Sequence, residues 1–545
     1  MRKKKLISAL LICMLALTGC GENKNTEGKR DSVLDYIDGK DKEKKDTQDE
    51  NTEDDRESDK DEGKVAENAV APKIEILGEF GEDRYYENEK LSLCNLTYNT
   101  LGVSNNEYPE LSDALDNWST ERKNELTSLL DEYSFMAAEN TALLEEYLEY
   151  DYHCMFSIYQ SLEVERVDSR VVSLLEYTST YTASENDLLR YTGLNFDAET
   201  GNMLSLSDIL DDEEGFYSAA TDYIIEDLKR TQLEEVLIPG YEEKVADMWN
   251  GNVSWYLDAS GVTIVFNPGD SDEIISPSAT YFRVCSTLPY SEFSEFISEK
   301  YVSTNHKGVV RLRTGEEYFL ETPNGMVNVH VELQVNEDIG FSSSIINVGD
   351  SRVKIGEFSY TEDAYIIKRN DDRVFMVITS DYMSDDYVTS LYEITDGDIK
   401  FCDEMPGAGL DGGTINTESI ILNVYLYTLG TYISKTEYEI DENGKFRQVD
   451  EMYHIGSENP TNNTAVLTTI QELPVVIDGM NTVLPAGSHI SITGTDDVSI
   501  ATFYDVDTQQ EGEIHYERGE GEDSWIIYIN GCSEYDYFEN LPYAG

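Results

Sequence analysis

Histidine often carries protons in hydrolases, because its pKa lies near neutrality. The chain of 545 residues has six: His153, His306, His330, His454, His489 and His515. No two lie within one helical turn of each other, and the sequence has no His-Glu-x-x-His pair, no Gly-x-Ser-x-Gly turn and no phosphate-binding loop. We therefore predict that the chain is not an enzyme and assign no catalytic residue. An envelope hydrolase acting on peptidoglycan, with residues that converge only in the fold, is the alternative.

Carboxylates are the next candidates, since calcium prefers carboxylate and carbonyl oxygens. Asp and Glu make up 109 of the 545 residues, so adjacent pairs arise by chance. Two clusters contain three carboxylates each: Asp270, Asp272 and Glu273, and Asp381, Asp385 and Asp386. Neither has the glycine and terminal glutamate of a helix–loop–helix calcium loop, so we interpret both as solvated acidic loops and predict no metal and no cofactor. A calcium-stabilised structural surface module is a further alternative.

Tryptophan and cysteine give weaker signals. The four tryptophans offer flat rings for sugars: Trp118, Trp249, Trp255 and Trp525. Each lies within an apolar pattern, which favours the core.

Five cysteines follow the N-terminal region: Cys94, Cys154, Cys285, Cys402 and Cys532. Their odd number and wide spacing fit neither a disulfide framework nor a zinc motif, so we interpret them as isolated buried thiols, with one or two long-range disulfides as the alternative.

The first 20 residues predict export and anchoring. Basic residues 2–5 precede an apolar run, Leu6–Leu17, which is shorter than the roughly 20 residues of a membrane span and fits a signal-peptide core. The sequence Leu-Thr-Gly-Cys at 17–20 resembles the lipobox of bacterial lipoproteins. In that family the cysteine thiol receives a diacylglyceryl group, and cleavage makes the cysteine the new N-terminus. The resemblance implies lipidation of Cys20 and a protein held on the extracytoplasmic face of the cell membrane, where two acyl chains such as palmitate anchor stably.

Residues 20–71 are the predicted tether between Cys20 and the folded body. They are almost all polar and carry mixed charges, as in the run Lys-Asp-Lys-Glu-Lys-Lys-Asp at 40–46. Such a segment cannot bury enough apolar area to offset the entropy lost on ordering. We predict a disordered charged linker whose ends lie about 40 Å apart.

The net charge excludes several classes of partner. Without residues 1–19 the chain has 36 basic and 109 acidic residues, a formal net charge of −73. Nucleic acid and anionic lipid surfaces bind through basic patches, so neither is expected. Cationic proteins, cationic peptides and metal ions are the partners that such a field attracts. The alternative is that the charge confers only solubility.

Periodicity divides the rest of the chain into three predicted units. Residues 72–302 combine alternating strand patterns with apolar residues at 3- and 4-residue spacings after Pro109, which predicts an α+β domain with helices on an antiparallel sheet. Residues 303–462 are strand after strand, separated by turn signals, and predict an all-β meander or propeller-like domain. Residues 463–545 have short strands and predict a small β-barrel-like domain.

Four pieces of the first unit carry a family resemblance. They are Tyr-Pro-Glu-Leu at 108–111, Val-Asp-Ser-Arg-Val-Val-Ser-Leu at 167–174, the segment 195–209 with Asn-Phe-Asp-Ala-Glu-Thr-Gly, and Gly-Val-Thr-Ile-Val-Phe-Asn-Pro at 261–268 with Leu-Pro-Tyr-Ser-Glu-Phe at 288–293. In this order they resemble the extracytoplasmic domain of the sigma-V anti-sigma factors, which bind lysozyme. The same type of domain precedes the catalytic domain in some peptidoglycan deacetylases. The resemblance covers about residues 75–301 and implies a cationic protein such as lysozyme, or the cell wall, as partner.

The sequence departs from this family at two loops, 180–187 and 268–277, which are acidic here. If they bind a ligand, the candidate residues are Ser184, Glu185, Asn186, Asp187, Asp270, Asp272 and Glu273. The Asp-Asp and His motifs of a deacetylase are missing. An anti-sigma role needs a cytoplasmic segment and a membrane-spanning helix, which a cleaved lipoprotein would lack.

The end of the chain, with Trp-Ile-Ile-Tyr-Ile-Asn-Gly at 525–531, resembles bacterial Src-homology-type barrels. Such barrels often bind cell-wall peptides or partner proteins. Together these patterns predict a non-catalytic cell-surface lipoprotein whose acidic body binds a cationic protein or cell-wall partner.

Overall fold

The computed structural model describes most of the chain beyond residue 68. It covers residues 69–545 except 87–90, 151–153, 183–188, 232–235, 252, 268–273, 277–282, 303–305, 336–341, 356–359, 383–386, 457–464, 520, 522–523, 540 and 544–545. Cys20 and the predicted tether up to residue 68 lie outside this part. In the described part of the chain, no helix is both long enough and apolar enough to cross a membrane.

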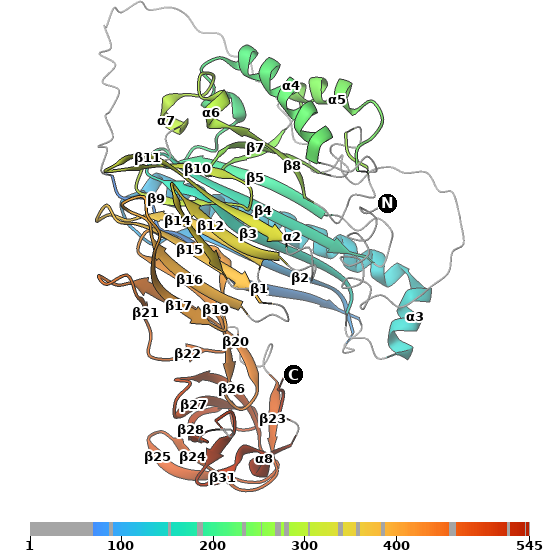
Figure 1. Ribbon diagram of the computed structural model, residues 1–545. Coiled ribbons are helices and arrows are strands. Elements are labelled where there is room, and N and C mark those ends of the chain that lie inside the picture. The colour runs from blue at the N-terminus through green and yellow to red at the C-terminus, as the bar shows by residue number, and fades with distance from the viewer. Residues whose placement is uncertain are drawn as a thin grey trace, which may run out of the picture. The chain divides into compact units, whose positions relative to one another are not determined.

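A ten-stranded sheet is the largest element of the fold (Figure 1). Its strands are β1 (Ile74–Tyr85), β2 (Ser92–Val103), β3 (Cys154–Asp168), β4 (Val171–Tyr181), β5 (Leu189–Asp197), β9 (Gly308–Arg311), β14 (Tyr360–Lys368), β15 (Val374–Asp381), β16 (Tyr387–Glu393) and β17 (Lys400–Pro406). The order is β1-β2-β3-β9-β14-β15-β16-β17, and β4 and β5 extend from β3. All the pairs are antiparallel except β2 with β3.

The parallel pair β2–β3 needs a crossover connection, and two helices supply it. They are α2 (Pro109–Glu139) and α3 (Thr141–Glu149). Helix α2 begins at Pro109, where a missing N–H costs nothing, and it buries Leu111, Leu115, Leu126 and Leu130 as the spacing predicts. It packs on the sheet, where the backbone N–H of Leu101 donates to the hydroxyl of Ser119 over 2.9 Å.

A second group of elements has its own apolar core. It contains the three-stranded sheet β6 (Ser254–Leu257), β7 (Gly261–Phe266) and β8 (Val284–Pro289), with the helices α4 (Glu213–Thr231), α5 (Tyr241–Asp247), α6 (Tyr290–Phe293) and α7 (Glu299–Val302) and the short 3-10 turns η3 (Leu206–Ile209) and η4 (Met248–Asn250). Phe216, Ile224 and Leu228 of α4 are fully buried in this core with Ile264 and Leu288 of the sheet.

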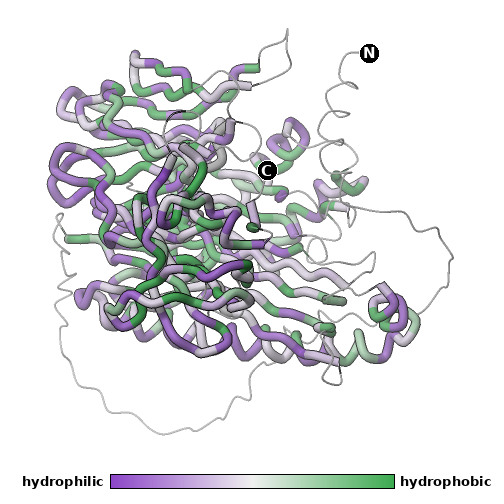
Figure 2. The backbone as a smooth tube through the Cα atoms, turned by 90° about the horizontal axis from the view of Figure 1, so that it is seen from below, coloured by the Kyte–Doolittle hydropathy of each residue, from purple (hydrophilic) through white to green (hydrophobic). Residues whose placement is uncertain are grey.

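Two four-stranded meanders follow chain order. The first contains β10 (Glu317–Thr322), β11 (Gly325–Val335), β12 (Ser342–Val348) and β13 (Ser351–Ile355), and the second contains β18 (Ala408–Ile415), β19 (Ser419–Tyr427), β20 (Thr431–Ile440) and β21 (Phe446–Gln448). Strand β20 alternates between buried and exposed residues, the period of a strand with one packed face. Figure 2 shows that hydrophobic and hydrophilic stretches follow one another along the chain.

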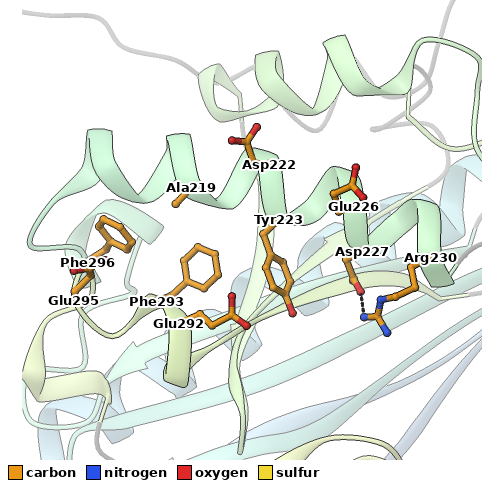
Figure 3. A pocket seen from close by; sticks show the side chains of 10 residues that line it. All are labelled: Ala219, Asp222, Tyr223, Glu226, Asp227, Arg230, Glu292, Phe293, Glu295 and Phe296. Atoms are coloured by element: carbon orange, nitrogen blue, oxygen red, sulfur yellow. Dashed lines mark hydrogen bonds and ion pairs between the residues drawn. The ribbon is translucent and has the colours of Figure 1, made fainter.

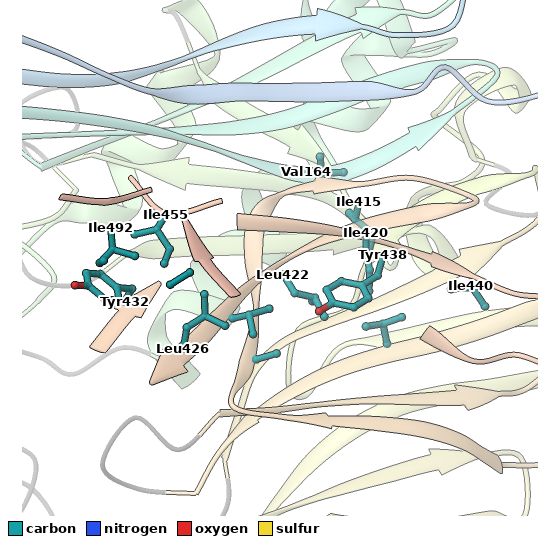
Figure 4. Packing of buried hydrophobic residues seen from close by; sticks show 14 of the residues in the cluster. Val164, Ile415, Ile420, Leu422, Leu426, Tyr432, Tyr438, Ile440, Ile455 and Ile492 are labelled. Carbon is teal, nitrogen blue, oxygen red and sulfur yellow. The ribbon is translucent and has the colours of Figure 1, made fainter. Parts of the chain in front are cut away.

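The C-terminal part is an eight-stranded sheet with a small three-stranded one. The larger sheet contains β22 (Tyr453–His454), β23 (Val466–Thr469), β24 (Leu473–Ile477), β25 (Met480–Leu484), β26 (His489–Thr495), β27 (Ile500–Asp505), β28 (Gln510–His515) and β32 (Phe538–Glu539). The smaller contains β29 (Glu517–Arg518), β30 (Ile527–Ile529) and β31 (Cys532–Ser533), and α8 (Glu534–Tyr537) follows it. One apolar cluster includes Leu426 and Tyr432 of the second meander and Ile492 of this sheet (Figure 4).

The described chain is mostly β-sheet with a few helices, and the predicted all-β character of residues 303–545 is confirmed apart from the one-turn α8. The region 303–462 is not a series of independent propeller blades, because β14–β17 belong to the ten-stranded sheet. The structure does not set residues 72–302 apart as an α+β unit, since β3 pairs with β9 across residue 302. The division of the chain into three domains stays a prediction.

Candidate binding groove

All seven predicted binding-loop residues lie outside the described part of the chain. They are Ser184, Glu185, Asn186, Asp187, Asp270, Asp272 and Glu273. Both loops flank described strands, since β4 ends at Tyr181 and β7 ends at Phe266. Their role as a binding surface stays a prediction, and the candidate site described next is a different one.

Helix α4 forms the first wall of this site. Its residues Phe216, Ala220, Ile224 and Leu228 recur every four positions and are buried in the core. Acidic residues in its first turn, and Lys229 and Arg230 in its last, suit the helix dipole. Beside the buried stripe runs a second one, which faces an open groove and contains Ala219, Asp222, Tyr223, Glu226, Asp227 and Arg230.

The second wall is α6 with the turn that follows it. Backbone bonds hold this turn in place: Asp211 N donates to Phe296 O over 2.8 Å, and Ser298 N donates to Ile209 O over 2.8 Å. Gly215, in the first turn of α4, allows a close approach, because a Cβ there would lie 2.9 Å from the ring of Phe296. The wall contributes Glu292, Phe293, Glu295 and Phe296 to the groove.

The groove encloses a volume of about 700 Å³, within the usual range for ligand sites. Three aromatic rings form its floor: Tyr223 meets Phe293 edge-on with centroids 5.4 Å apart, and Phe293 lies 6.2 Å from Phe296. Phe293 is only 3% exposed and anchors the floor in the core. Figure 3 shows these rings with the carboxylates that surround them.

Five carboxylates and one guanidinium line the groove. Of these carboxylates, Asp227 has the most interactions in the described chain. It pairs with Arg230 at 2.6 Å and accepts a hydrogen bond from the Ser286 hydroxyl at 2.7 Å. Within the described residues, Asp222, Glu292 and Glu295 have no ion pair and no hydrogen bond through their side chains. Counting the described residues alone, the groove therefore has more negative than positive side chains.

The phenol of Tyr223 stays protonated in this setting. Burial raises its pKa, and the charges of Asp227 and Glu292 raise it further. The tyrosine therefore offers the groove a neutral hydroxyl and an aromatic face. Aromatic faces attract Lys and Arg side chains as well as apolar groups.

The described histidines lie elsewhere. His454, His489 and His515 lie near carboxylates at 3.8, 3.1 and 3.3 Å on exposed surfaces, and His330 and His306 are half-buried. His306 shares a cavity with Asp168 and Lys368, but its volume of about 10 Å³ holds no more than a water molecule. None of these five lines the groove, and no group of three His, Cys, Asp or Glu that could hold a metal occurs among the described residues.

Buried charges also occur beside the β3–β9 pair, where they form ion pairs between distant segments. Arg311 pairs with Glu163, and Arg313 pairs with Glu165, which is fully buried. Arg313 also lies over the ring of Tyr256 at 5.1 Å from its centroid. These pairs link residues nearly 150 positions apart and hold the sheet together, so we assign them a structural role.

The tryptophans and cysteines differ partly from their predictions. Trp255 is buried, and Trp118 and Trp249 are partly buried against the core. Trp525 is 56% exposed and lies near Tyr535, which corrects the interpretation of all four as core.

The five described cysteines are free thiols, and burial raises the pKa of Cys94 to about 12, so this thiol is unreactive near neutrality. Cys532 is exposed and does not fit the prediction of buried thiols.

Sequence reasoning missed the groove, although part of its signal is present. Asp222 and Glu226 lie one helical turn apart, and Tyr223 lies between them on the same side of the helix. A helical projection of residues 213–231 would have shown an aromatic and acidic stripe beside the apolar one. The facing segment 292–296 could not be found in this way, because nothing local indicates that it lies against α4.

Comparisons with known proteins give little further information. No protein-family model matches the chain, and no curated protein matches it. The solved structures that are similar to part of it include two DUF3298 family proteins. One is a member of the DUF3298 family from Bacteroides fragilis, with 17% identity, a TM-score of 0.31 and coverage of 43% of this chain and 99% of that chain. The other is a DUF3298 family protein from Pseudomonas aeruginosa, with 16% identity, a TM-score of 0.29 and coverage of 43% and 98%.

TM-scores this low do not establish a common fold, so no property of either protein is transferred to this chain. Neither protein is described as an anti-sigma factor or a deacetylase. The specific resemblance seen in the sequence therefore stays a prediction.

Proposed function

We propose that this chain is a non-catalytic lipoprotein, held by a lipid on Cys20 at the extracytoplasmic face of the cell membrane, whose acidic body binds a cationic protein or cell-wall partner. The observation that supports the proposal most is the groove between α4 and α6. It combines an aromatic floor with three carboxylates, those of Asp222, Glu292 and Glu295, that have no cationic partner among the described residues.

Electrostatics supports this choice of partner. The whole chain has a formal net charge of −69, and a cleft lined by one sign of charge focuses the field and raises the local concentration of counter-charged ligands. Uncompensated carboxylates repel each other, and a cationic surface relieves that repulsion. The aromatic floor adds apolar contact with the partner, which attraction between charges alone does not provide.

The finer proposal concerns lysozyme. The groove is built from residues 219–230 and 292–296, which lie inside the segment, about 75–301, that resembles the extracytoplasmic domain of the lysozyme-binding anti-sigma factors. Lysozyme, a cationic protein, is therefore the first partner to test.

The experiment measures binding of lysozyme to the full chain by calorimetry at low and at high salt. We expect binding at about 20 mM salt that weakens steeply by 0.5 M, because salt screens exposed charges. Acetylated lysozyme, which keeps the fold and loses its lysine charges, is the control and should bind weakly.

Loss of binding in Asp222→Asn/Glu226→Gln, with normal binding in Glu145→Gln/Glu146→Gln on α3, would assign the interaction to the groove. Absence of binding to lysozyme and to cationic cell-wall fractions at low salt would refute the proposed function. Equal binding at all salt concentrations would refute its electrostatic basis.

A further inference from the structure

The groove has two acidic rims on either side of an apolar floor. The rims come from different elements: Asp222 and Glu226 from α4, and Glu292 and Glu295 from α6 and its turn. The floor lies between them and consists of Ala219, Tyr223, Phe293 and Phe296 (Figure 3). A ligand that matches this order has an apolar centre flanked by positive charge on both sides.

We propose that the groove binds a basic amphipathic α-helix of a protein partner. The apolar stripe of that helix packs on the aromatic floor, and its Lys and Arg side chains extend to the rims on both sides. This inference rests on the proposed function and deepens it, because it states which surface of the cationic partner is recognised.

The dimensions of the groove fit a helix. Its lining residues on α4 extend from Ala219 to Arg230, eleven positions along the chain, which corresponds to roughly 16 Å or three helical turns. A helix in a groove uses apolar anchors at positions i, i+3 or i+4, and i+7, and these span about the same length. Tyr223 and Phe296 are both half-buried, so each has ring surface left for an anchor to cover.

The charges in the groove favour one class of ligand over others. Asp222, Glu292 and Glu295 lack partners among the described residues, and Glu226 has only a 3.7 Å contact with Lys229. A small polyamine would neutralise these carboxylates but leave the aromatic floor uncovered. An apolar helix without basic residues would cover the floor but bury carboxylates without compensation, which is costly. The basic amphipathic helix is the class that satisfies both.

Two synthetic peptides test the inference. One is an 18-residue Leu/Lys helix with a single apolar stripe, and the other has the same composition in an order without a stripe. Each is labelled and titrated with the full chain in detergent at about 0.15 M salt, with fluorescence anisotropy as the readout. We expect the striped peptide to bind about tenfold more tightly or better, because only it covers the floor.

Two variants locate the binding site. Ala219→Trp fills the floor without changing charge and should abolish the advantage of the striped peptide. Asp222→Asn/Glu226→Gln should weaken the striped peptide by about tenfold or more, whereas the matched control Glu145→Gln/Glu146→Gln on α3 should not. If circular dichroism shows that Ala219→Trp does not fold, the charge variant and its control carry the test.

The outcomes distinguish this inference from the proposed function. Equal, salt-sensitive binding of both peptides, unaffected by the groove variants, would overturn the helix site and leave cationic binding standing. Spermine carries positive charge but no apolar stripe. If it displaces the striped peptide as well as its charge alone predicts, the helix site would also be overturned. Failure of both peptides and of lysozyme to bind at low salt would refute both proposals.

Discussion

Glu316, just before β10, is a carboxyl group whose acidity is strongly altered by its surroundings. It is half-buried next to Asp258, which is fully buried and accepts hydrogen bonds from Ser260 N, Gly261 N and the Thr263 hydroxyl. Burial, and then the charge of Asp258, raise the pKa of Glu316 to about 7, against the opposing charge of Arg313. Between pH 4.5 and about 7, Glu316 is therefore largely protonated in the folded chain and largely ionised in the unfolded chain.

The stability of the fold should depend on pH through Glu316. Because the pKa is raised from 4.5 in the unfolded chain to about 7 in the fold, the stabilising contribution of Glu316 is complete below pH 4.5 and is lost as the pH rises through 7. We expect the melting temperature of Glu316→Gln to exceed that of the natural chain by an amount that grows between pH 4.5 and 8. Glu317→Gln, an exposed neighbour, is the control. A difference that stays constant over this range would contradict the assignment.

Cys20 is the residue on which the proposed location depends. We expect Cys20→Ser expressed in a bacterium to lose incorporation of labelled palmitate and to leave the membrane fraction, because the lipid on Cys20 is the proposed anchor. Cys532→Ser changes an exposed thiol far along the chain and should remain in the membrane fraction with its label. Retention of Cys20→Ser at the membrane would show that another segment anchors the protein.

At the scale of elements, two neighbouring faces of helix α4 have different roles. One face buries Phe216, Ile224 and Leu228 in the core, and the other presents Asp222 and Glu226 to the groove. Because these stripes are distinct, stability and binding should respond to different residues. This follows from the helical period, which turns successive residues through about 100°.

A pair of substitutions on α4 tests this separation. Leu228→Ala removes a fully buried side chain and should lower the free energy of unfolding by about 2–5 kcal/mol. Glu226→Gln changes an exposed side chain and should alter it by no more than about 0.5 kcal/mol while it weakens cationic binding. Chemical denaturation measures both variants. Similar losses of stability in the two would show that the groove face is part of the structural core.

At the scale of the whole molecule, long-range pairing connects segments that the sequence patterns assign to different units. Arg166–Asp168 at the end of β3 pair with Gly308–Val310 of β9, and β9 pairs in turn with β14. The buried Arg166 also donates to the carbonyl of Tyr301 at 2.6 Å and pairs with Asp168 at 2.8 Å. The sheet thus depends on residues from both sides of position 302.

A truncation tests whether residue 302 is a domain boundary. A fragment 69–302 lacks β9 and β14–β17, so we expect it to unfold without a cooperative transition and to bind a hydrophobic dye. A fragment 69–456 keeps all ten strands and should unfold cooperatively. A sharp transition and protease resistance in the shorter fragment would instead establish the predicted α+β domain as independent.

The sequence by itself determined the features that depend on neighbouring residues. The strand patterns of residues 303–462 and the 3- and 4-residue apolar spacings after Pro109 correspond to observed elements, β20 and α2 among them. Periodicity is readable because a strand or helix places residues two, three or four positions apart on one face. The net charge and the lipobox-like pattern that ends at Cys20 can also be read from the sequence alone, although the structure does not describe that residue.

Only the tertiary structure decided which elements meet. It joined β3 to β9, left Trp525 exposed while Trp255 became buried, and placed Phe293 and Phe296 opposite Tyr223. The two walls of the groove are some seventy residues apart in the chain. No pattern within one segment records such a pairing, because it results from the packing of apolar faces and from backbone hydrogen bonds between distant strands.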